Sequence, residues 1–247
     1  YSSNCPTIYR WSRVQREGNR MMPSLDKFAG DLSRMWKLQE REPLHHLTWD
    51  WWWWLLMLDD EKDDTAAGRQ LMVLWSTKDN PLVEVNGYPW MPKGRPGFDK
   101  DGGIAMDGMI AAWWFDGKKM IEPLILEESR IVVIAEDHPD WPAKKGGIVA
   151  STTSSEYSMG LSPDETSFWL RLETKEGDFD FTMKPWNRAM STMKQADAIY
   201  AGGMGYGITR LHGALCEGTI DGVSTKGTSY FQKVCVQAPS VPWFWGM

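Results

Sequence analysis

Apolar and polar residues alternate most strictly between residues 166 and 183. Every second position is apolar on both sides of a Lys175-Glu176-Gly177 turn, and these positions are Phe168, Leu170, Leu172, Phe179, Phe181 and Met183. Alternation with a period of two places one face of a strand in the interior and the other face in water. This segment is therefore predicted to be an antiparallel hairpin, half buried against the rest of the protein.

The alternating pattern recurs along the chain from residue 44 onward. Residues 79–103 interrupt it, because they are rich in proline and glycine and are expected to form turns. Many short strands without intervening helices predict an antiparallel barrel or sandwich. The further strands are predicted over 47–58, 68–77, 104–115, 124–126, 131–136, a Ser- and Thr-rich pair within 148–159, and a last hairpin of 206–220 and 229–237.

Two segments depart from this pattern. Ser24 is expected to cap a helix whose apolar residues recur every three or four positions as far as Leu38, before Pro43 ends it. A short helix is also predicted near residues 190–198. Residues 1–43 are thus expected to be a helical extension and residues 44–247 the β region, with an incomplete second barrel from about residue 205 left open.

Composition adds one strong signal, because 16 of the 247 residues are tryptophan. A buried indole removes roughly 150–250 Å² from water, so this number of rings requires either an oversized core or a cavity that indoles line. The sequence leaves both interpretations open.

Charge and cysteine content disfavour several classes of protein. The net charge is −6, and no cluster of basic residues suggests binding to nucleic acid. No apolar run reaches the roughly 20 residues that a membrane-spanning helix needs. The cysteines, Cys5, Cys216 and Cys235, are odd in number and lack metal-binding spacing. We therefore expect a cytoplasmic protein without a disulfide framework, a metal ion or another cofactor.

Asp50 is the first candidate for chemistry. In the run of tryptophans from residue 49 to 54 it shares a strand face with Trp52 and Trp54. A carboxyl group among indoles is poorly hydrated, which disfavours its charged form and makes it a candidate general acid. The alternative is a structural role, in which Asp50 bonds to the backbone or to an arginine.

A second candidate region lies in the strand predicted over residues 104–115. The small residues Ala111 and Ala112 precede Trp113 and Trp114. Small side chains beside indoles leave room for a ligand, or equally for the close approach of another strand.

The last predicted hairpin offers a polar cluster. Arg210 and His212 share one face of its first strand, and Tyr230 and Gln232 share one face of its second strand. If the register brings these faces together, the cluster is suited to orienting a carbonyl group or transferring a proton. An outer polar face is the alternative, because the sequence does not fix the register.

Several strand-like segments together point to a known family. They are HLTWDWWWWLLML, GRQLMVLWSTK, DGMIAAWWFDGKKM, and GALCEGTIDGVSTKGTSYFQKV close to PWFWG. Their order resembles the lipocalin-like (calycin) family of carotenoid 1,2-hydratases and AttH-type proteins. The resemblance implies a fold of the all-β class, an antiparallel lipocalin-like β-barrel or β-sandwich, here with a short helical N-terminal segment. It also implies a hydrophobic pocket for isoprenoid or polyketide substrates, but it carries over no catalytic residue.

The sequence thus predicts that the protein binds an apolar molecule, terpenoid, polyketide or lipid-like, in a pocket lined by tryptophan. Whether it is an enzyme stays open. If it is one, the expected reaction is a cofactor-free, acid-assisted hydration, cyclisation or isomerisation, as in a hydratase, a cyclase-type lyase or an isomerase. The predicted catalytic residues are Asp50, His212 and Tyr230, and the predicted ligand-binding residues are Trp52, Trp54, Trp113, Trp114, Arg210 and Gln232.

Three alternatives compete with this reading. The first is a lipid carrier without catalysis, and the second is a carbohydrate-active or carbohydrate-binding β-sandwich whose exposed indoles stack on sugars. The third is a structural subunit of a larger assembly. It is favoured by the apolar run from Val241 to Met247, which we expect to dock on a partner subunit or on a further domain of a longer chain.

Overall fold

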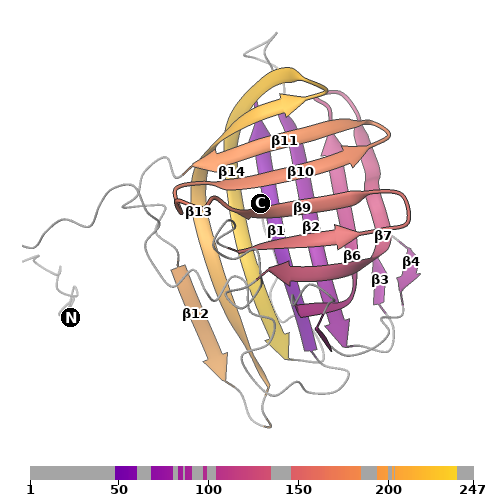
Figure 1. Ribbon diagram of the computed structural model, residues 1–247, viewed down its shortest axis with the longest axis vertical. Coiled ribbons are helices and arrows are strands. Elements are labelled where there is room, and N and C mark those ends of the chain that lie inside the picture. The colour runs from indigo at the N-terminus through magenta and orange to yellow at the C-terminus, as the bar shows by residue number, and fades with distance from the viewer. Residues whose placement is uncertain are drawn as a thin grey trace, which may run out of the picture.

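The computed structural model shows a protein built of antiparallel β-strands (Figure 1). It describes residues 48–59, 68–79, 83–85, 87–90, 97–98, 104–134, 146–184, 194–199, 202 and 204–237. The predicted N-terminal helix and the apolar C-terminal run lie outside these residues. The strands are β1 (Thr48–Leu58), β2 (Arg69–Asp79), β3 (Val83–Val85), β4 (Tyr88–Trp90), β5 (Gly97–Phe98), β6 (Ile104–Phe115), β7 (Met120–Ile134), β8 (Gly147–Ser151), β9 (Glu156–Leu161), β10 (Phe168–Thr174), β11 (Gly177–Lys184), β12 (Lys194–Ile199), β13 (Gly205–Ile220) and β14 (Val223–Gln237).

Ten of these strands close into a barrel, which confirms the predicted all-β antiparallel class. The hydrogen-bonded order runs β11-β10-β9-β8-β7-β6-β2-β1-β14-β13, and β13 pairs with β11 to close the ring. The predicted hairpin is β10–β11, with Phe168 opposite Met183. Closure leaves these strands without a free edge at the level where β11 and β13 pair.

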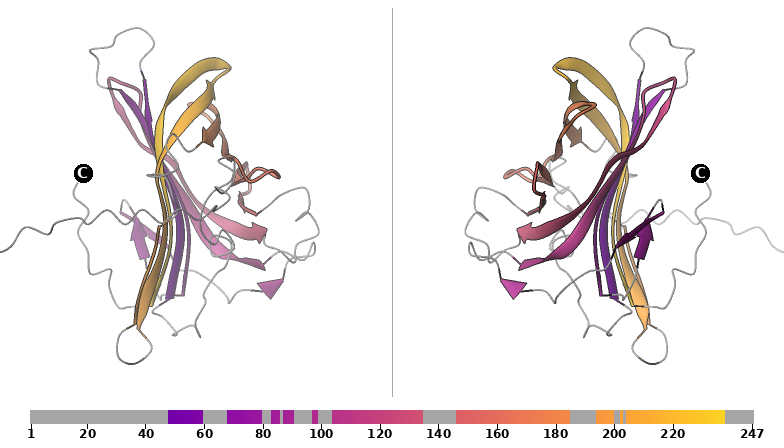
Figure 2. Two further views of the ribbon diagram at one scale, coloured as in Figure 1. Left: turned by 90° about the vertical axis from the view of Figure 1, so that its left-hand side faces the viewer. Right: turned by 90° about the vertical axis from the view of Figure 1, so that its right-hand side faces the viewer.

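The barrel does not close along its whole length. β11 pairs only with residues 215–220 of β13, whereas residues 205–210 of β13 pair with β12 instead. Figure 2 shows that the wall formed by β13, β14, β1 and β2 separates from the opposite wall toward the lower end of the molecule. We call this lower end the mouth of the barrel.

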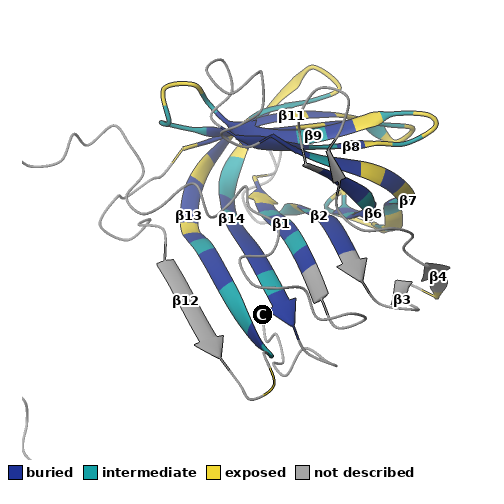
Figure 3. Cartoon of the chain, turned by 60° about the horizontal axis from the view of Figure 1, so that its bottom comes forward, coloured by how far each residue is buried: buried dark blue, intermediate teal, exposed yellow. Residues whose placement is uncertain are grey.

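The inner face of the barrel carries the core. Register places Trp52 of β1 opposite Trp75 of β2, and both side chains are completely buried, as is Trp54. The outer neighbours Trp51 and Trp53 are only half-buried. Figure 3 shows the same alternation of buried and less buried residues along β1. The two faces predicted for the tryptophan-rich strand are therefore an inner and an outer face.

The structure contradicts the helix predicted near residues 190–198. Lys194–Ile199 form strand β12, which pairs antiparallel with Gly205–Arg210 of β13. The physical reason is the departure of β11, which leaves the edge of β13 without a partner at this level. Backbone hydrogen bonds to that edge outweigh the weak helical pattern of the segment.

The split of residues 124–136 into two strands was also wrong. β7 runs without interruption from Met120 to Ile134 and pairs with nearly the full length of β6. The polar residues from Glu127 to Arg130 suggested a loop, yet they continue the alternation across the wall of the barrel.

The hairpin from residue 205 onward, β13–β14, is part of the same barrel, because β14 pairs with β1.

Candidate functional site

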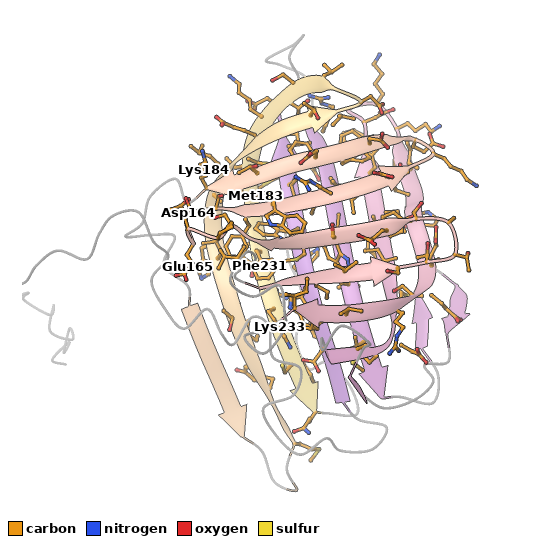
Figure 4. All side chains as sticks on the ribbon, in the orientation of Figure 1. Asp164, Glu165, Met183, Lys184, Phe231 and Lys233 are labelled. Carbon is orange, nitrogen blue, oxygen red and sulfur yellow. The ribbon has the colours of Figure 1, made fainter. Side chains whose placement is uncertain are left out.

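A charged group of side chains lies on the inner wall near the mouth. Asp50 of β1 is the register partner of Cys235 of β14, and Trp52 is the partner of Lys233. Because alternate residues of a strand share a face, Lys233 and Cys235 both stand on the inner side with Asp50. Figure 4 shows Lys233 closer to the mouth than Phe231 on the same strand. We call Asp50, Lys233 and Cys235 the polar centre.

Short contacts link the three side chains of the polar centre, of which Asp50 and Lys233 are buried and Cys235 is half-buried. Lys233 Nζ forms an ion pair with Asp50 Oδ1 and lies 2.6 Å from Cys235 Sγ. The Cys235 thiol donates to the same carboxylate oxygen at 2.7 Å. The ammonium group also sits 4.8 Å from the ring centroid of Trp52, within range of a cation–π interaction. The side chains of Lys233 and Asp50 are only 2% and 3% exposed.

The pKa shifts define the protonation states of the two β14 side chains. Burial acts to lower the pKa of Lys233, but the Asp50 carboxylate and Cys235 outweigh burial, so that the pKa is raised above its ordinary value. Burial, reinforced by the negative charge of Asp50, raises the pKa of the Cys235 thiol to about 12. Near neutral pH Lys233 is therefore an ammonium and Cys235 a neutral thiol. The centre offers no thiolate nucleophile. Lys233 Nζ also donates to the Val234 carbonyl oxygen at 3.4 Å, so a ligand oxygen bound to the ammonium would replace one of its three acceptors.

Aromatic side chains fill the interior beyond the polar centre. The ring centroid of Trp54 lies 5.6 Å from that of Phe168 and 4.7 Å from that of Phe231. Trp54 Nε1 also donates to Met159 Sδ at 3.3 Å across the barrel. Of the predicted indoles on β1, Trp54 thus belongs to the packed core, while Trp52 borders the polar centre.

The two adjacent tryptophans of β6 point to opposite sides of the wall. Trp114 faces inward, is 5% exposed and packs edge-on against Phe179 with centroids 5.3 Å apart. Trp113 is half-buried on the outer face. The interior receives only the second of the two indoles, because neighbouring residues of a strand alternate between faces.

A second polar contact lies on the opposite inner wall. Glu127 of β7 is the partner of the buried Ile110 and so faces inward. Tyr157 Oη donates to Glu127 Oε1 at 3.2 Å. Burial is the main cause that raises the pKa of Tyr157 above its ordinary value. The interior is therefore apolar in most places, with polar groups on two facing walls.

The predicted cluster on the last hairpin does come together, on the outer face of the wall. Arg210 is the partner of Gln232, and Tyr230 Oη donates to Gln232 Oε1 at 2.8 Å. The His212 ring centroid lies 6.2 Å from that of Tyr230. Because Gln232 stands between inward-facing neighbours, the wall separates this cluster from the polar centre. The predicted site residues of β1 therefore lie on the inner side of this wall, and those of the last hairpin lie on its outer side.

Sequence reasoning missed Lys233 and Cys235. Both lie on the same strand as Tyr230 and Gln232, but on the other face. The alternation of the sequence could have grouped them, because Phe231, Lys233 and Cys235 share one face of the strand. This face points inward because its residues pair with the inward-facing residues of β1. A lysine on that face contradicts the expectation that lysine points to water, and only the pairing with Asp50 explains it.

The fold defines the protein as a closed antiparallel β-barrel of ten strands, consistent with the lipocalin-like class that the sequence predicted. Within the described ranges, His, Cys, Asp and Glu side chains do not gather in threes as a metal site would require. A helix able to span a membrane is not found in the part of the chain that the structure describes.

Comparison with known proteins adds one distant similarity. No protein-family model and no curated protein matches the chain. Among solved structures, the S-type phycobiliprotein lyase CPES from Guillardia theta is similar, with 10% identity and a TM-score of 0.25 over 78% of this chain and 88% of that chain. At this TM-score the similarity carries no argument about function, and membership of the carotenoid 1,2-hydratase family is not shown.

Proposed function

We propose that the barrel binds an apolar small molecule, terpenoid, polyketide or lipid-like, and that Lys233 and Asp50 hold a polar oxygen group of that molecule at the mouth. The observation that carries this proposal is the buried ion pair between Lys233 and Asp50 on an inner wall of indoles. The polar centre supplies one anchoring point, and the aromatic walls supply the apolar surface around it.

The energetics of the ion pair support a functional role over a structural one. Removing two charges from water costs several kcal/mol per ion, and their attraction repays this only in part. Apolar residues of similar volume would stabilise the barrel equally well or better. A charged pair buried within an otherwise apolar interior is therefore a candidate binding site.

The dimensions of the barrel fit the same proposal. A barrel of about eight strands is just wide enough for its own side chains or for one small ligand. Because barrel diameter grows with the number of strands, a ring of ten is expected to be wider than one of eight. Since aromatic side chains pack the region around Trp54, Phe168 and Phe231, the ligand is expected near the mouth, beside the polar centre.

Burial of the indoles favours a ligand inside the barrel over sugar stacking on its surface. Every tryptophan whose burial the structure describes is buried or half-buried, and none is exposed. Sugar-binding indoles need an open ring face. This observation supports the lipid-like ligand class against the carbohydrate alternative.

Catalysis is the second candidate function. Lys233 at 4.8 Å from the Trp52 ring shows that this ring face can hold a positive charge. The resemblance to carotenoid hydratases points to acid-assisted hydration, cyclisation or isomerisation, in which a carbocation develops beside indoles. Asp50 is here a carboxylate paired with the Lys233 ammonium, so it has to take up a proton before it can act as the acid. Asp50 now accepts hydrogen bonds from Lys233 and Cys235 at Oδ1, so a reacting ligand has to displace one of these donors.

The test removes the charged pair without leaving an unpaired ion. Retinol, an apolar terpenoid with one hydroxyl group, serves as the probe, and quenching of tryptophan fluorescence reports its binding. The double variant Asp50→Leu/Lys233→Met should retain the stability of the wild type, or exceed it, and should bind retinol about tenfold more weakly. The control Lys184→Met changes an exposed lysine on β11 and should bind as the wild type does.

Three outcomes separate the alternatives. Equal retinol affinity in the double variant and the wild type contradicts the proposed role of the pair. A large loss of stability in the double variant identifies the pair as structural. Mass spectrometry of retinol after incubation with the wild type distinguishes the remaining candidates: new product indicates an enzyme, and unchanged retinol indicates a carrier.

A further inference from the structure

We propose that the outer face of β13 and β14 carries a second site, which binds the carboxylate group of a small apolar acid through Arg210 and Gln232. This site lies on the side of the wall opposite to the polar centre. It is therefore independent of the function proposed for the barrel interior.

Two adjacent donors on this face have no acceptor among the residues that the structure describes. Gln232 is completely buried, yet its Nε2 has no hydrogen-bond partner. Arg210 Nε is also buried without a partner, and Arg210 stands directly opposite Gln232 in the register. A buried donor without an acceptor costs roughly 1–3 kcal/mol, and more when the donor is charged. Side-by-side donors of this kind indicate a place for an acceptor group.

Tyr230 fixes which end of the Gln232 amide is offered. Tyr230 Oη donates to Gln232 Oε1 at 2.8 Å, so the oxygen of the amide is occupied and the nitrogen is left for another group. Burial raises the pKa of Tyr230, and the positive charge of Arg210 offsets part of this rise. The guanidinium charge of Arg210 therefore lies close to the Tyr230 hydroxyl group. The cluster therefore presents N–H donors and a positive charge together.

A carboxylate matches these donors better than a neutral acceptor does. It provides two acceptor oxygens and the negative charge, and guanidinium groups bind it with two parallel hydrogen bonds. Among the described residues, no acidic side chain forms an ion pair with Arg210. Arg210 and Tyr230 are only half-buried, which leaves a route by which a ligand can reach Gln232.

The surroundings of the donors determine the rest of the ligand. Ile208 and Val234 lie on the same outer face, one alternate position from Arg210 and Gln232, and they form a small apolar cluster with Trp51 and Tyr206. Ile208 and Val234 are themselves buried, whereas Trp51 and Tyr206 are half-buried, so Trp51 and Tyr206 provide the apolar surface beside a carboxylate bound by Arg210 and Gln232. The ligand class is an aliphatic or aromatic monocarboxylic acid.

The test uses octanoate as the probe and octan-1-ol as its neutral counterpart. Titration of the ¹⁵N-labelled protein should shift the Arg210 Nε–H signal and the Gln232 side-chain amide signals with octanoate, whereas octan-1-ol should leave them in place. Gln232→Glu puts a negative charge against the carboxylate, and Arg210→Met removes the positive one. Each variant should weaken octanoate binding at this site about tenfold or more.

Controls keep this test distinct from that of the barrel interior. Arg171→Met changes an exposed arginine that pairs with Asp180 at 3.4 Å on β10 and β11, and it should leave the octanoate shifts unchanged. The interior variant Asp50→Leu/Lys233→Met should leave them unchanged as well. Arg210→Lys, which keeps the charge, covers the case in which Arg210→Met fails to fold. Unmoved Arg210 and Gln232 signals, or full affinity in Gln232→Glu, overturn the proposal.

Discussion

At the scale of single residues, β14 shows how different the two faces of one strand can be. Lys233 points inward and holds its charge against Asp50 and Trp52, whereas its neighbour Gln232 points outward toward Arg210. The barrel wall is one strand thick, so a step of one residue moves a side chain from the interior to the outside. Both of the proposed sites arise from this alternation.

The thiols of Cys216, which is buried, and of Cys235, which is half-buried, give the protein a predicted dependence on pH. The pKa of Cys216 and that of Cys235 are both raised from 9.0 to about 12, mainly by burial. In the unfolded chain these thiols lose their protons near pH 9, whereas in the folded chain they keep them up to about pH 12. Between these values the unfolded state binds fewer protons, so the free energy of unfolding falls as pH rises.

Urea unfolding measures this effect. The free energy of unfolding should be lower at pH 10 than at pH 8 by roughly 1–3 kcal/mol. The raised pKa of Lys233 acts in the same direction. In the variant Cys216→Ala/Cys235→Ala the difference between the two pH values should shrink. A variant that keeps the whole difference would show that the thiols are not its cause.

At the scale of elements, β13 determines where the barrel is closed and where it is open. One half of the strand pairs with β11 and completes the ring, and the other half pairs with β12 beside the mouth. A shift in register between Leu211 and Ala214 separates the two halves on the β14 side. Such irregularities bend a strand and increase its twist, which suits a position between the closed and open parts of the barrel.

Gly218 is predicted to be essential for closure of the barrel. A Cβ atom at this position would collide with the Asp180 carbonyl oxygen and lie 2.7 Å from Phe181 Cα, both in the backbone of β11. Backbone atoms can give way only if β11 moves away from β13. Gly218→Ala should therefore lower the free energy of unfolding by about 2 kcal/mol or more in urea denaturation.

The matched control for Gly218 lies on the same strand. Leu215 is 47% exposed, so Leu215→Ala should change stability by no more than about 0.5 kcal/mol. If Gly218→Ala is as stable as this control, the close approach of β11 and β13 does not limit the fold.

At the scale of the whole molecule, aromatic side chains hold opposite walls together. Phe168 of β10 stacks on Phe231 of β14 with centroids 5.8 Å apart, and Trp54 of β1 contacts both rings. Trp75 Nε1 adds a hydrogen bond to the Tyr157 carbonyl oxygen at 3.4 Å across the interior. Part of the tryptophan excess thus serves as core.

Removal of one ring should weaken the whole barrel. Phe231 is completely buried, so Phe231→Ala should cost about 3–5 kcal/mol of unfolding free energy, because it loses buried area and leaves a cavity. Met120→Ala, at a position that is 53% exposed, is the control and should have little effect. Thermal or urea unfolding that shows equal stability in both variants would contradict the view of this aromatic cluster as the main core.

The sequence by itself determined most of the strands and the faces on which their residues lie. Alternation of apolar and polar residues is a local property. It placed Asp50 and Trp52 on one face of their strand, and Phe168 and Phe181 on the buried faces of the two strands of their hairpin. The same property grouped Arg210 with His212, and Tyr230 with Gln232. It failed where the local signal was weak, at β7 and β12.

Only the tertiary structure decided which faces meet and which of them point inward. Lys233 became part of a site because β1 and β14, 183 positions apart at the Asp50–Lys233 pair, lie side by side in one register. The strand β12 formed because the departure of β11 left backbone groups of β13 without partners. Both outcomes depend on long-range strand pairings, of β1 with β14 and of β11 with β13, and a pattern of side chains along the chain does not encode such pairings.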